Sequence, residues 1–178
     1  WKYGMDYIDS KYLAQEMLIN EFVTTGFPVI IINPTFMVGP FDSGPSSGKL
    51  LIGLHANRLP GYTSGGKNFV CTNDVAVAAV NALSQGRCGE CYIAGHRNLS
   101  YKEFLSLASK TMEKNFKLKK LQSWLVLSVG AFYSLSARVA GKKPALSYSM
   151  ARMATLDQYY SPAKAQNELQ MPQTPIEI

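Results

Sequence analysis

The chain has 178 residues, which is enough for one domain with a buried core of its own. Hydrophobic residues make up 47% and charged residues 17% of it, a balance that excludes an intrinsically disordered chain. Much of the net charge of +6 lies between Lys110 and Lys120, but no aromatic or glycine-rich RNA-binding pattern accompanies these lysines, so a solvated surface is favoured over a nucleic-acid partner.

The first predicted elements are a helix and a buried strand. Apolar residues recur at helical spacing from about Met5 to Thr25, and Gly26 and Pro28 then supply the signals that end a helix. The run Val29–Ile32 is short, apolar and β-branched, which is typical of a strand buried on both faces of a parallel sheet. A helix joined to such a strand by a short turn is half of a βαβ unit and predicts α/β architecture.

The later elements are predicted from turn, cap and periodicity signals. The stretch from Pro34 to Gly48 is rich in Pro, Gly and Ser and predicts a long loop. Ser100, followed three residues later by Glu103, predicts a capping box for a helix that runs to about Glu113. The other predicted elements are a helix at Lys49–Asn57, short strands at Gly61–Thr63 and Asn68–Cys71, a helix over 75–85 capped by Asn73 or Asp74 and ended by Gly86, a strand at Cys91–Ala94, helices near Leu121–Ala137 and Tyr148–Ala154, and a last helix with Ser161 as N-cap and Pro162 at its first position.

Tyr7 and Lys11 lie four residues apart in the first predicted helix. Side chains with this spacing share one helical face, so a phenol and an ammonium ion are placed side by side. A cation about 4 Å away stabilises a phenolate by roughly 1 kcal/mol in water and about 4 kcal/mol at an effective dielectric constant of 20. The pair is therefore suited to acid–base chemistry at a carbonyl or alcohol oxygen.

Spacing alone does not identify a site, because the same Tyr-x-x-x-Lys pattern recurs at Tyr160 and Lys164. There, Ser161–Pro162 predicts a helix start, which leaves Tyr160 outside the helix and off the face of Lys164. For Tyr7 and Lys11, an ordinary exposed pair is the alternative interpretation.

Cys88 and Cys91 form a Cys-x-x-Cys pattern, with Cys71 and His96 as conceivable further zinc ligands. A thioredoxin-like redox motif is a second alternative. A structural zinc site usually has a second close pair, which this chain lacks, and Cys91 opens an apparent strand. Packing is therefore favoured, and we expect no metal and no disulfide.

The stretch Leu121–Ala137 contains no charged residue and lies between Lys120 and Arg138. A membrane-spanning helix needs about 20 mostly apolar residues, whereas this stretch is shorter and includes four serines. An amphipathic helix that covers a pocket or an interface is favoured, and attachment to a membrane surface is the alternative.

Four further segments resemble, in order, motifs of the extended short-chain dehydrogenases/reductases (the NAD-dependent epimerase/dehydratase superfamily). After the Tyr-x-x-x-Lys helix, these segments are Val29–Pro40 with its Asn-Pro and Val-Gly-Pro, Phe69–Ala76, Gly89–Gly95 followed by Leu99–Ser100, and Ser161–Leu169. They cover nearly the whole chain, and the dihydroflavonol-reductase-like branch is the most similar.

The resemblance implies the C-terminal part of a Rossmann-type doubly wound parallel sheet (about 1–40 and 68–95), interleaved with a small, mostly helical substrate-binding region (about 41–67 and 96–178). The glycine-rich phosphate-binding turn and the catalytic Ser or Thr would precede Trp1, and we expect the chain to be part of a longer protein. The 178 residues alone are then expected to be inactive and not to bind a dinucleotide tightly.

The resemblance also implies a cytoplasmic enzyme that uses NAD or NADP and acts on a carbonyl or alcohol, either as a reductase of a small or hydrophobic ketone or on a nucleotide sugar. A catalytically silent NAD(P) sensor is the alternative. Tyr7 would be the acid/base, and Lys11 would bind the nicotinamide ribose. A small-molecule substrate and a homodimer are expected, but no nucleic-acid or membrane partner. The other implied cofactor-binding residues are Pro34, Thr35, Phe36, Met37 and Ser47.

Overall fold

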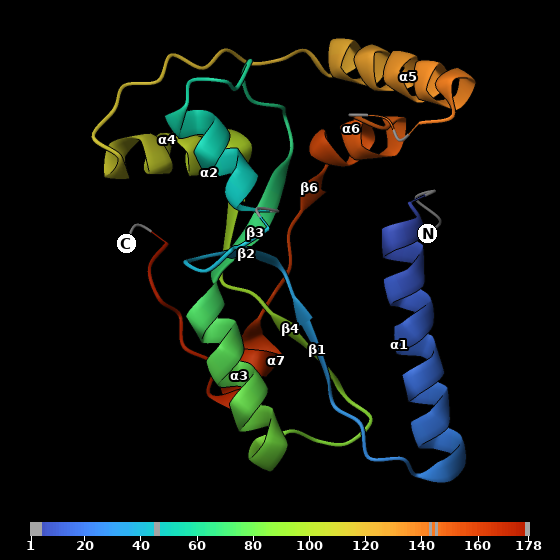
Figure 1. Cartoon of the computed structure of the whole chain (residues 1–178). Coiled ribbons are helices and arrows are strands. Elements are labelled where there is room, and N and C mark those ends of the chain that lie inside the picture. The colour runs from blue at the N-terminus through green and yellow to red at the C-terminus, as the bar shows by residue number, and fades with distance from the viewer. Residues whose placement is uncertain (1–4, 45–46, 143, 145, 177–178) are drawn as a thin grey trace. The chain divides into compact units, whose positions relative to one another are not determined.

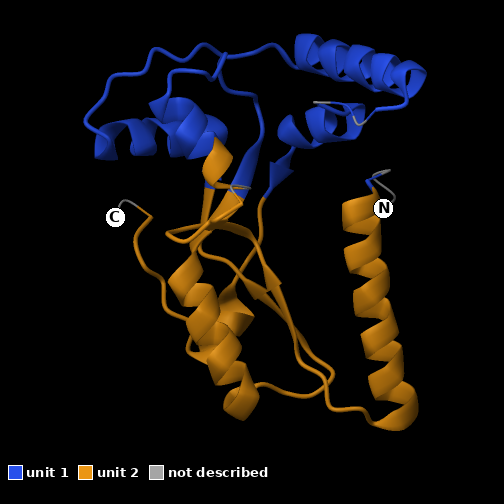
Figure 2. Ribbon diagram, viewed as in Figure 1, with its two compact units in different colours: residues 1–5, 50–67, 99–158 blue, residues 6–49, 68–98, 159–178 orange. Residues whose placement is uncertain are grey.

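The computed structural model describes the chain except residues 1–4, 45–46, 143, 145 and 177–178. The chain forms two compact units, each built from several stretches of sequence (Figure 2). Unit 1 comprises Trp1–Met5, Leu50–Lys67 and Leu99–Gln158, and unit 2 comprises Asp6–Lys49, Asn68–Asn98 and Tyr159–Ile178. The predicted division into a nucleotide-binding part and a substrate-binding part stays a prediction, because compactness alone assigns no function.

The chain is built from helices and short strands that are interspersed along the sequence (Figure 1). In order they are α1 (Asp6–Thr25), β1 (Ile31–Pro34), β2 (Phe36–Val38), α2 (Gly48–His55), β3 (Gly66–Cys71), α3 (Thr72–Gln85), β4 (Cys91–Ala94), β5 (Arg97–Ser100), α4 (Tyr101–Thr111), α5 (Ser123–Ala140), α6 (Tyr148–Ala154), β6 (Asp157–Gln158) and α7 (Ala163–Leu169).

Unit 2 contains a parallel strand pair covered by helices. β1 pairs with β4 in parallel, from Ile31 opposite Cys91 to Pro34 opposite Ala94. α3 and α7 pack against each other and against β4. Parallel strands with helical connections confirm the predicted α/β architecture. The buried core of this unit is formed by Val70, Val75, Ala78, Ala82, Tyr92, Ala94, Ala165, Leu169 and Met171.

The prediction of one long loop from Pro34 to Gly48 is wrong at its beginning. β2 lies there and pairs in parallel with β3, from Phe36 opposite Phe69 to Val38 opposite Cys71. The two phenylalanine rings meet edge to face with centroids 5.1 Å apart. The composition of this stretch is typical of a loop, and its three strand residues form β2 because they pair with β3. β1 is also only half-buried, with Pro34 exposed, and not buried on both faces as predicted.

In unit 1, α5 packs on α6, and Gly130 of α5 lies close to Ala151. The capping box predicted for α4 is confirmed: the Ser100 hydroxyl accepts from the Glu103 amide, and the Glu103 carboxylate accepts from the Ser100 amide. The predicted strand at Gly61–Thr63 is reduced to a single bridge between Tyr62 and Lys120.

The predicted caps of two helices are wrong. The N-cap of α3 is Cys71, and Asp74 is instead buried in the first turn, where its carboxylate accepts hydrogen bonds from the Thr174 amide and hydroxyl at 2.8 and 2.7 Å. For α7 the N-cap is Pro162, not Ser161. The carboxylate that could have capped α3 thus holds the segment after α7, a long-range contact that local cap rules do not predict.

Candidate functional site

The candidate catalytic residues Tyr7 and Lys11 lie on one face of α1. The Lys11 Nζ atom is 5.7 Å from the centroid of the Tyr7 ring. The Tyr7 side chain is 70% exposed. Among the described residues, neither its hydroxyl nor the Lys11 ammonium group has a hydrogen-bonding partner, so both polar groups are available to a ligand.

Gln15 continues this row by one further turn, because it lies four residues after Lys11. Its Oε1 accepts a hydrogen bond of 2.9 Å from Nδ2 of Asn33, in the last half of β1. The face of α1 that bears the phenol and the ammonium ion is therefore the face that meets the Asn33–Pro34 strand end. Gln15 was not among the predicted site residues, although its spacing from Lys11 is the signal that would have identified it.

A second contact fixes the other end of α1. Gly89, in the turn before β4, has a φ of 82° and lies directly under the ring of Phe22. A Cβ added at Gly89 would come within 2.3 Å of that ring, so the close approach requires glycine. The Gly89 amide also donates to the carbonyl of Val29 at 2.7 Å. Together with the Gln15 contact, this packing orients α1 relative to β1 and β4.

Most of the predicted cofactor-binding residues lie at or just after the carboxyl end of β1. Pro34 ends the strand and is exposed. The Thr35 hydroxyl points inward and donates to the Asn68 side chain at 2.9 Å, while Phe36 packs on Phe69. Met37 is partly exposed, and Ser47 lies in the turn that precedes α2. In parallel α/β sheets, ligands bind beyond the carboxyl ends of the strands, and Pro34 lies at such an end.

The side chain of Asn68 forms four hydrogen bonds that connect the end of β1 to neighbouring segments. It is buried, and its Oδ1 accepts from the Thr35 hydroxyl and from the His96 amide, both at 2.9 Å. Its Nδ2 donates to Oδ1 of Asn98 at 2.7 Å and to the carbonyl of Tyr160 at 3.2 Å. One side chain thus joins the β1–β2 corner, the β4–β5 corner and the segment before α7. The sequence analysis took Asn68 only as the first residue of a strand.

The second Tyr-x-x-x-Lys pattern is structural. Tyr160 precedes α7, as predicted, whereas Lys164 lies inside it. The Lys164 Nζ atom donates to the Glu90 carboxylate at 2.5 Å and to the carbonyl of Cys91 at 2.9 Å. This lysine therefore connects α7 to the start of β4. Its ammonium group is bound to the protein's own carboxylate and carbonyl groups, so it does not form a second Tyr-Lys site with Tyr160.

Charged groups around β4 form a compact network. Arg87 donates two hydrogen bonds to the Glu168 carboxylate at 2.8 and 3.0 Å, and the Tyr92 hydroxyl donates to the same carboxylate at 2.7 Å. These donors, the arginine foremost, hold the pKa of Glu168 below its ordinary value. The hydrogen bond from Lys164 lowers the pKa of Glu90 in the same way. The network ties α7 to the sheet and offers no unpaired acid or base.

The cysteine pattern does not resemble a metal or redox site. Cys71, Cys88 and Cys91 are all free thiols. Burial raises the pKa of the Cys91 thiol, which disfavours the thiolate that redox chemistry needs. Within the part of the chain that the structure describes, no three His, Cys, Asp or Glu side chains gather where they could hold a metal ion.

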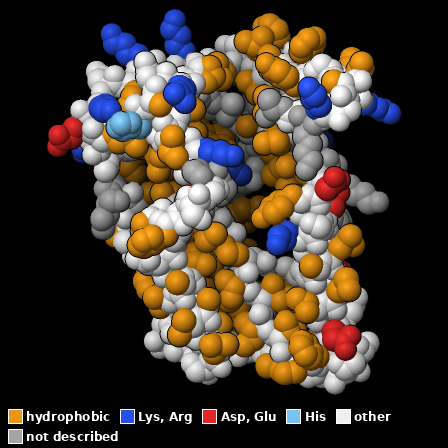
Figure 3. All heavy atoms as spheres, in the orientation of Figure 1, with side chains coloured by type: hydrophobic (Ala, Val, Ile, Leu, Met, Phe, Trp, Pro, Cys, Tyr) orange, Lys and Arg blue, Asp and Glu red, His pale blue; other side chains and the backbone are white. Residues whose placement is uncertain are grey.

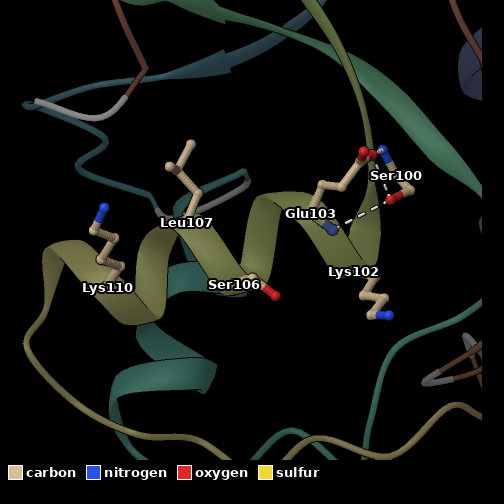
Figure 4. A pocket seen from close by; sticks show the side chains of 6 residues that line it. All are labelled: Ser100, Lys102, Glu103, Ser106, Leu107 and Lys110. Atoms are coloured by element: carbon tan, nitrogen blue, oxygen red, sulfur yellow. Dashed lines mark hydrogen bonds between the residues drawn. The ribbon is translucent and has the colours of Figure 1, made fainter.

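Unit 1 carries a surface hollow of about 560 Å³ along α4. It is lined by Ser100, Lys102, Glu103, Ser106, Leu107 and Lys110. Figure 4 shows the Glu103 and Ser100 side chains turned toward each other in the capping box, while Lys102 and Lys110 point away from the helix at its two ends. The Ser100 hydroxyl lies beside the Glu103 carboxylate in this hollow, but both groups are bound to backbone amides in the capping box, so we assign them a structural role.

No protein-family model matches the chain. A curated relative, a putative dihydroflavonol 4-reductase from Synechocystis sp., is 27% identical over 175 residues, which are 96% of this chain and 51% of that protein. The chain thus spans about half the length of this relative.

Solved structures share the fold. A nucleoside-diphosphate-sugar epimerase from Pseudomonas aeruginosa superposes with a TM-score of 0.76 at 20% identity, over 97% of this chain and 52% of that one. A dTDP-glucose 4,6-dehydratase from Streptomyces venezuelae, solved with NAD bound, gives a TM-score of 0.66 at 15% identity, over 95% of this chain and 46% of that one. The shared fold is Rossmann-type α/β, and, as its motifs predict, the chain is similar to proteins named as dihydroflavonol 4-reductase and as nucleotide-sugar epimerases and dehydratases.

Proposed function

We propose that this chain is part of an NAD(P)-dependent oxidoreductase or epimerase/dehydratase in which Tyr7 and Lys11 carry the proton-transfer chemistry. The observation that carries the proposal is the row formed by Tyr7, Lys11 and Gln15, whose last member is hydrogen-bonded to Asn33 at the end of β1. The row directs the phenol and the ammonium ion to the side of α1 that faces the strand end. The similarity to a protein named as a reductase of dihydroflavonol supports the same class of reaction.

The residues at this strand end fit a nicotinamide nucleotide. The Lys11 ammonium group has three N–H donors and no acceptor, which suits the vicinal hydroxyls of a ribose. Exposed Pro34 and partly exposed Met37 offer apolar surface for a planar ring. Because Asn68 and Ala94 occupy the Thr35 hydroxyl, this residue would meet the ligand through its backbone.

The chain's own contribution is proton transfer and orientation. NAD(P), when bound, supplies the hydride acceptor or donor. In reduction the Tyr7 hydroxyl gives its proton to the substrate oxygen and becomes a phenolate, and in oxidation the Tyr7 phenolate takes the proton of the substrate alcohol. The Lys11 ammonium ion stabilises the phenolate in both directions. The Gln15–Asn33 hydrogen bond supports this role, because it orients the face of α1 that bears both side chains toward β1. The substrate is a carbonyl or an alcohol, either a hydrophobic ketone or a nucleotide sugar.

Replacing Tyr7 by Phe tests this assignment, and the test uses the complete protein because the 178 residues alone are expected to be inactive. Loss of an acid/base group lowers turnover on the order of 10²–10⁴-fold, so we expect Tyr7→Phe to lower NAD(P)-dependent turnover by that factor. Tyr160→Phe is the matched control, because Tyr160 belongs to the same spacing pattern but lies outside its helix, and it should retain activity.

Turnover is measured with a panel of ketones and nucleotide sugars, and NAD(P) affinity is measured separately by fluorescence titration. Full turnover by the Tyr7→Phe protein would reject Tyr7 as the acid/base. Tight NAD(P) binding by the unaltered protein without turnover of any substrate would instead support a catalytically silent sensor.

A further inference from the structure

α5 presents an apolar face that the described residues leave uncovered. Trp124, Phe132, Leu135 and Val139 are between 65% and 84% exposed, and at 100° per residue they fall within one quadrant of the helix. Leu125 extends the same face. In the space-filling view, hydrophobic side chains gather over this helix (Figure 3). A continuous exposed face of this kind marks an interaction site, whereas scattered apolar side chains do not.

The opposite face of α5 is already occupied. Gly130 and Ala137 are buried, and a Cβ on Gly130 would come within 2.6 Å of the Ala151 side chain in α6. The Ser134 hydroxyl accepts a hydrogen bond of 2.8 Å from the Tyr148 amide at the start of α6. The helix is long and apolar enough to cross a membrane by length and composition. However, its packing on α6 leaves only one face for lipid, so a position in the membrane plane fits better than a transmembrane one.

The charge distribution around α5 is one-sided. The segment 114–156 contains no Asp or Glu and eight of the 18 basic residues, so the rest of the chain has a net charge of −2. Lys and Arg side chains lie along the stretch before α5 in Figure 3. The basic side chains that the structure describes in this segment are exposed on both sides of the helix, where they are complementary to anionic phosphates. The basic residues of this segment are Lys114, Lys117, Lys119, Lys120, Arg138, Lys142, Lys143 and Arg152.

We propose that α5 is a peripheral membrane-docking helix that lies in the surface of an anionic bilayer. Trp124, Phe132 and Leu135 would insert between the lipid headgroups, while the lysines before and after the helix would contact phosphates. Apolar insertion and attraction to anionic lipid act together in such helices. From the sequence, a helix that covers a pocket or an interface is favoured and attachment to a membrane surface is the alternative. The exposed apolar face of α5 favours the alternative, because a helix in the membrane plane needs only such a face.

A second copy of this chain is a less suitable occupant of the same face. Two copies meeting through α5 would bring two segments of like charge together, each with eight cations and no anion between residues 114 and 156. Repulsion of like charges across an interface opposes such a contact. Membrane docking through α5 is independent of the proposed enzymatic function, because α5 and its flanking lysines include no residue of the Tyr7–Lys11 site.

Flotation with lipid vesicles tests the proposal. The protein is mixed with vesicles of phosphatidylcholine alone or with about 30% phosphatidylserine, a mole fraction on the order of that in anionic cytoplasmic leaflets. We expect binding only to the anionic vesicles. Lys119→Glu with Lys120→Glu should weaken it at least fivefold per charge, the factor that corresponds to about 1 kcal/mol for each basic residue near the surface. Phe132→Ser with Leu135→Ser should abolish binding.

Val80→Ser with Leu83→Ser is the matched control, because these α3 side chains are equally exposed and apolar but lie in unit 2. Circular dichroism verifies that each variant is folded. In a Trp1→Phe background, the emission of Trp124 should also shift to shorter wavelength on anionic vesicles. Absence of flotation would overturn the proposal. So would equal loss of binding in the α3 control, or a concentration-dependent dimer that the α5 substitutions disrupt without any vesicle binding.

Discussion

α1 and α3 belong to the same unit but are held in the protein in opposite ways. α3 buries Val75, Ala78 and Ala82 and packs on β4 and α7. α1 is longer, yet none of its described residues is buried, and Met17 and Val23 are more than 70% exposed. α3 thus contributes to the buried core but bears no candidate catalytic residue. α1 bears Tyr7 and Lys11, and none of its described residues is part of the core.

The difference follows from the side chains that each helix offers. The alanines of α3 let its backbone approach the sheet closely, so that a large apolar area is buried. α1 is fixed by two point contacts, the Gln15–Asn33 hydrogen bond and the Phe22 ring over Gly89. Stability and activity should therefore respond to different residues, a separation that substitutions can test.

The largest effect on stability is expected at Leu169, in the core where α7 meets α3. This side chain is fully buried, and Leu169→Ala removes its contacts and leaves a cavity. We expect a loss of about 2–5 kcal/mol in the free energy of unfolding. The control is Met17→Ala on α1, which should change the free energy of unfolding by less than about 0.5 kcal/mol. Denaturant titration measures both, and equal losses would refute the contrast between the two helices.

A somewhat smaller effect is expected at Asn68. Asn68→Ala leaves the Thr35 hydroxyl and the His96 amide without the acceptor that they share. Unpaired buried polar groups cost roughly 1–3 kcal/mol, so the free energy of unfolding should fall by about that amount. Asn20→Ala, on the exposed surface of α1, is the comparison and should be neutral or slightly stabilising, because alanine favours helix. If Asn68→Ala proves as harmless as Asn20→Ala, the four hydrogen bonds at Asn68 do not hold the strand end.

Elements with strong local signals could be predicted from the sequence. The bounds of β4 and α6 agree with the prediction, and the capping box of α4 forms as expected. In contrast, β2 and β5 were missed, because strands of three or four residues exist through their pairing with β3. Their residues carry no pattern that distinguishes them from loop.

The same distinction applies to the candidate site. Tyr7 and Lys11 could be found because their relation is local, one helical turn along the chain. Gln15 and Asn68 could not be assigned a role, because their partners lie 18 to 92 residues away in the sequence. Their signals, a third residue at helical spacing and a polar residue in an apolar strand, gain meaning only when the partner is known.

The smallest expected effect concerns the charged network that joins α7 to β4. The pKa of Glu168 is held below its ordinary value, mainly by the hydrogen bonds from Arg87 and also by the Tyr92 hydroxyl. Its ionised form therefore stabilises the fold at pH values above the glutamate pKa of the unfolded chain, about 4.3, and this contribution is lost as the pH falls through the lower pKa of the folded state. Because the carboxylate is still partly exposed to solvent, which screens its interactions, the loss should be small.

Glu168→Gln removes this titration, so its free energy of unfolding should fall less steeply between pH 5 and the acid limit of folding, roughly pH 3, than that of the unaltered protein. Unfolding by urea at a series of pH values measures the slope. Glu16→Gln is the control on α1, where no described residue forms an ion pair with the carboxylate, and it should keep the original slope. If Glu168→Gln also keeps that slope, the network contributes no pH-dependent stability. The contrast between the two helices would then rest on apolar burial and on the hydrogen bonds of Asn68 alone.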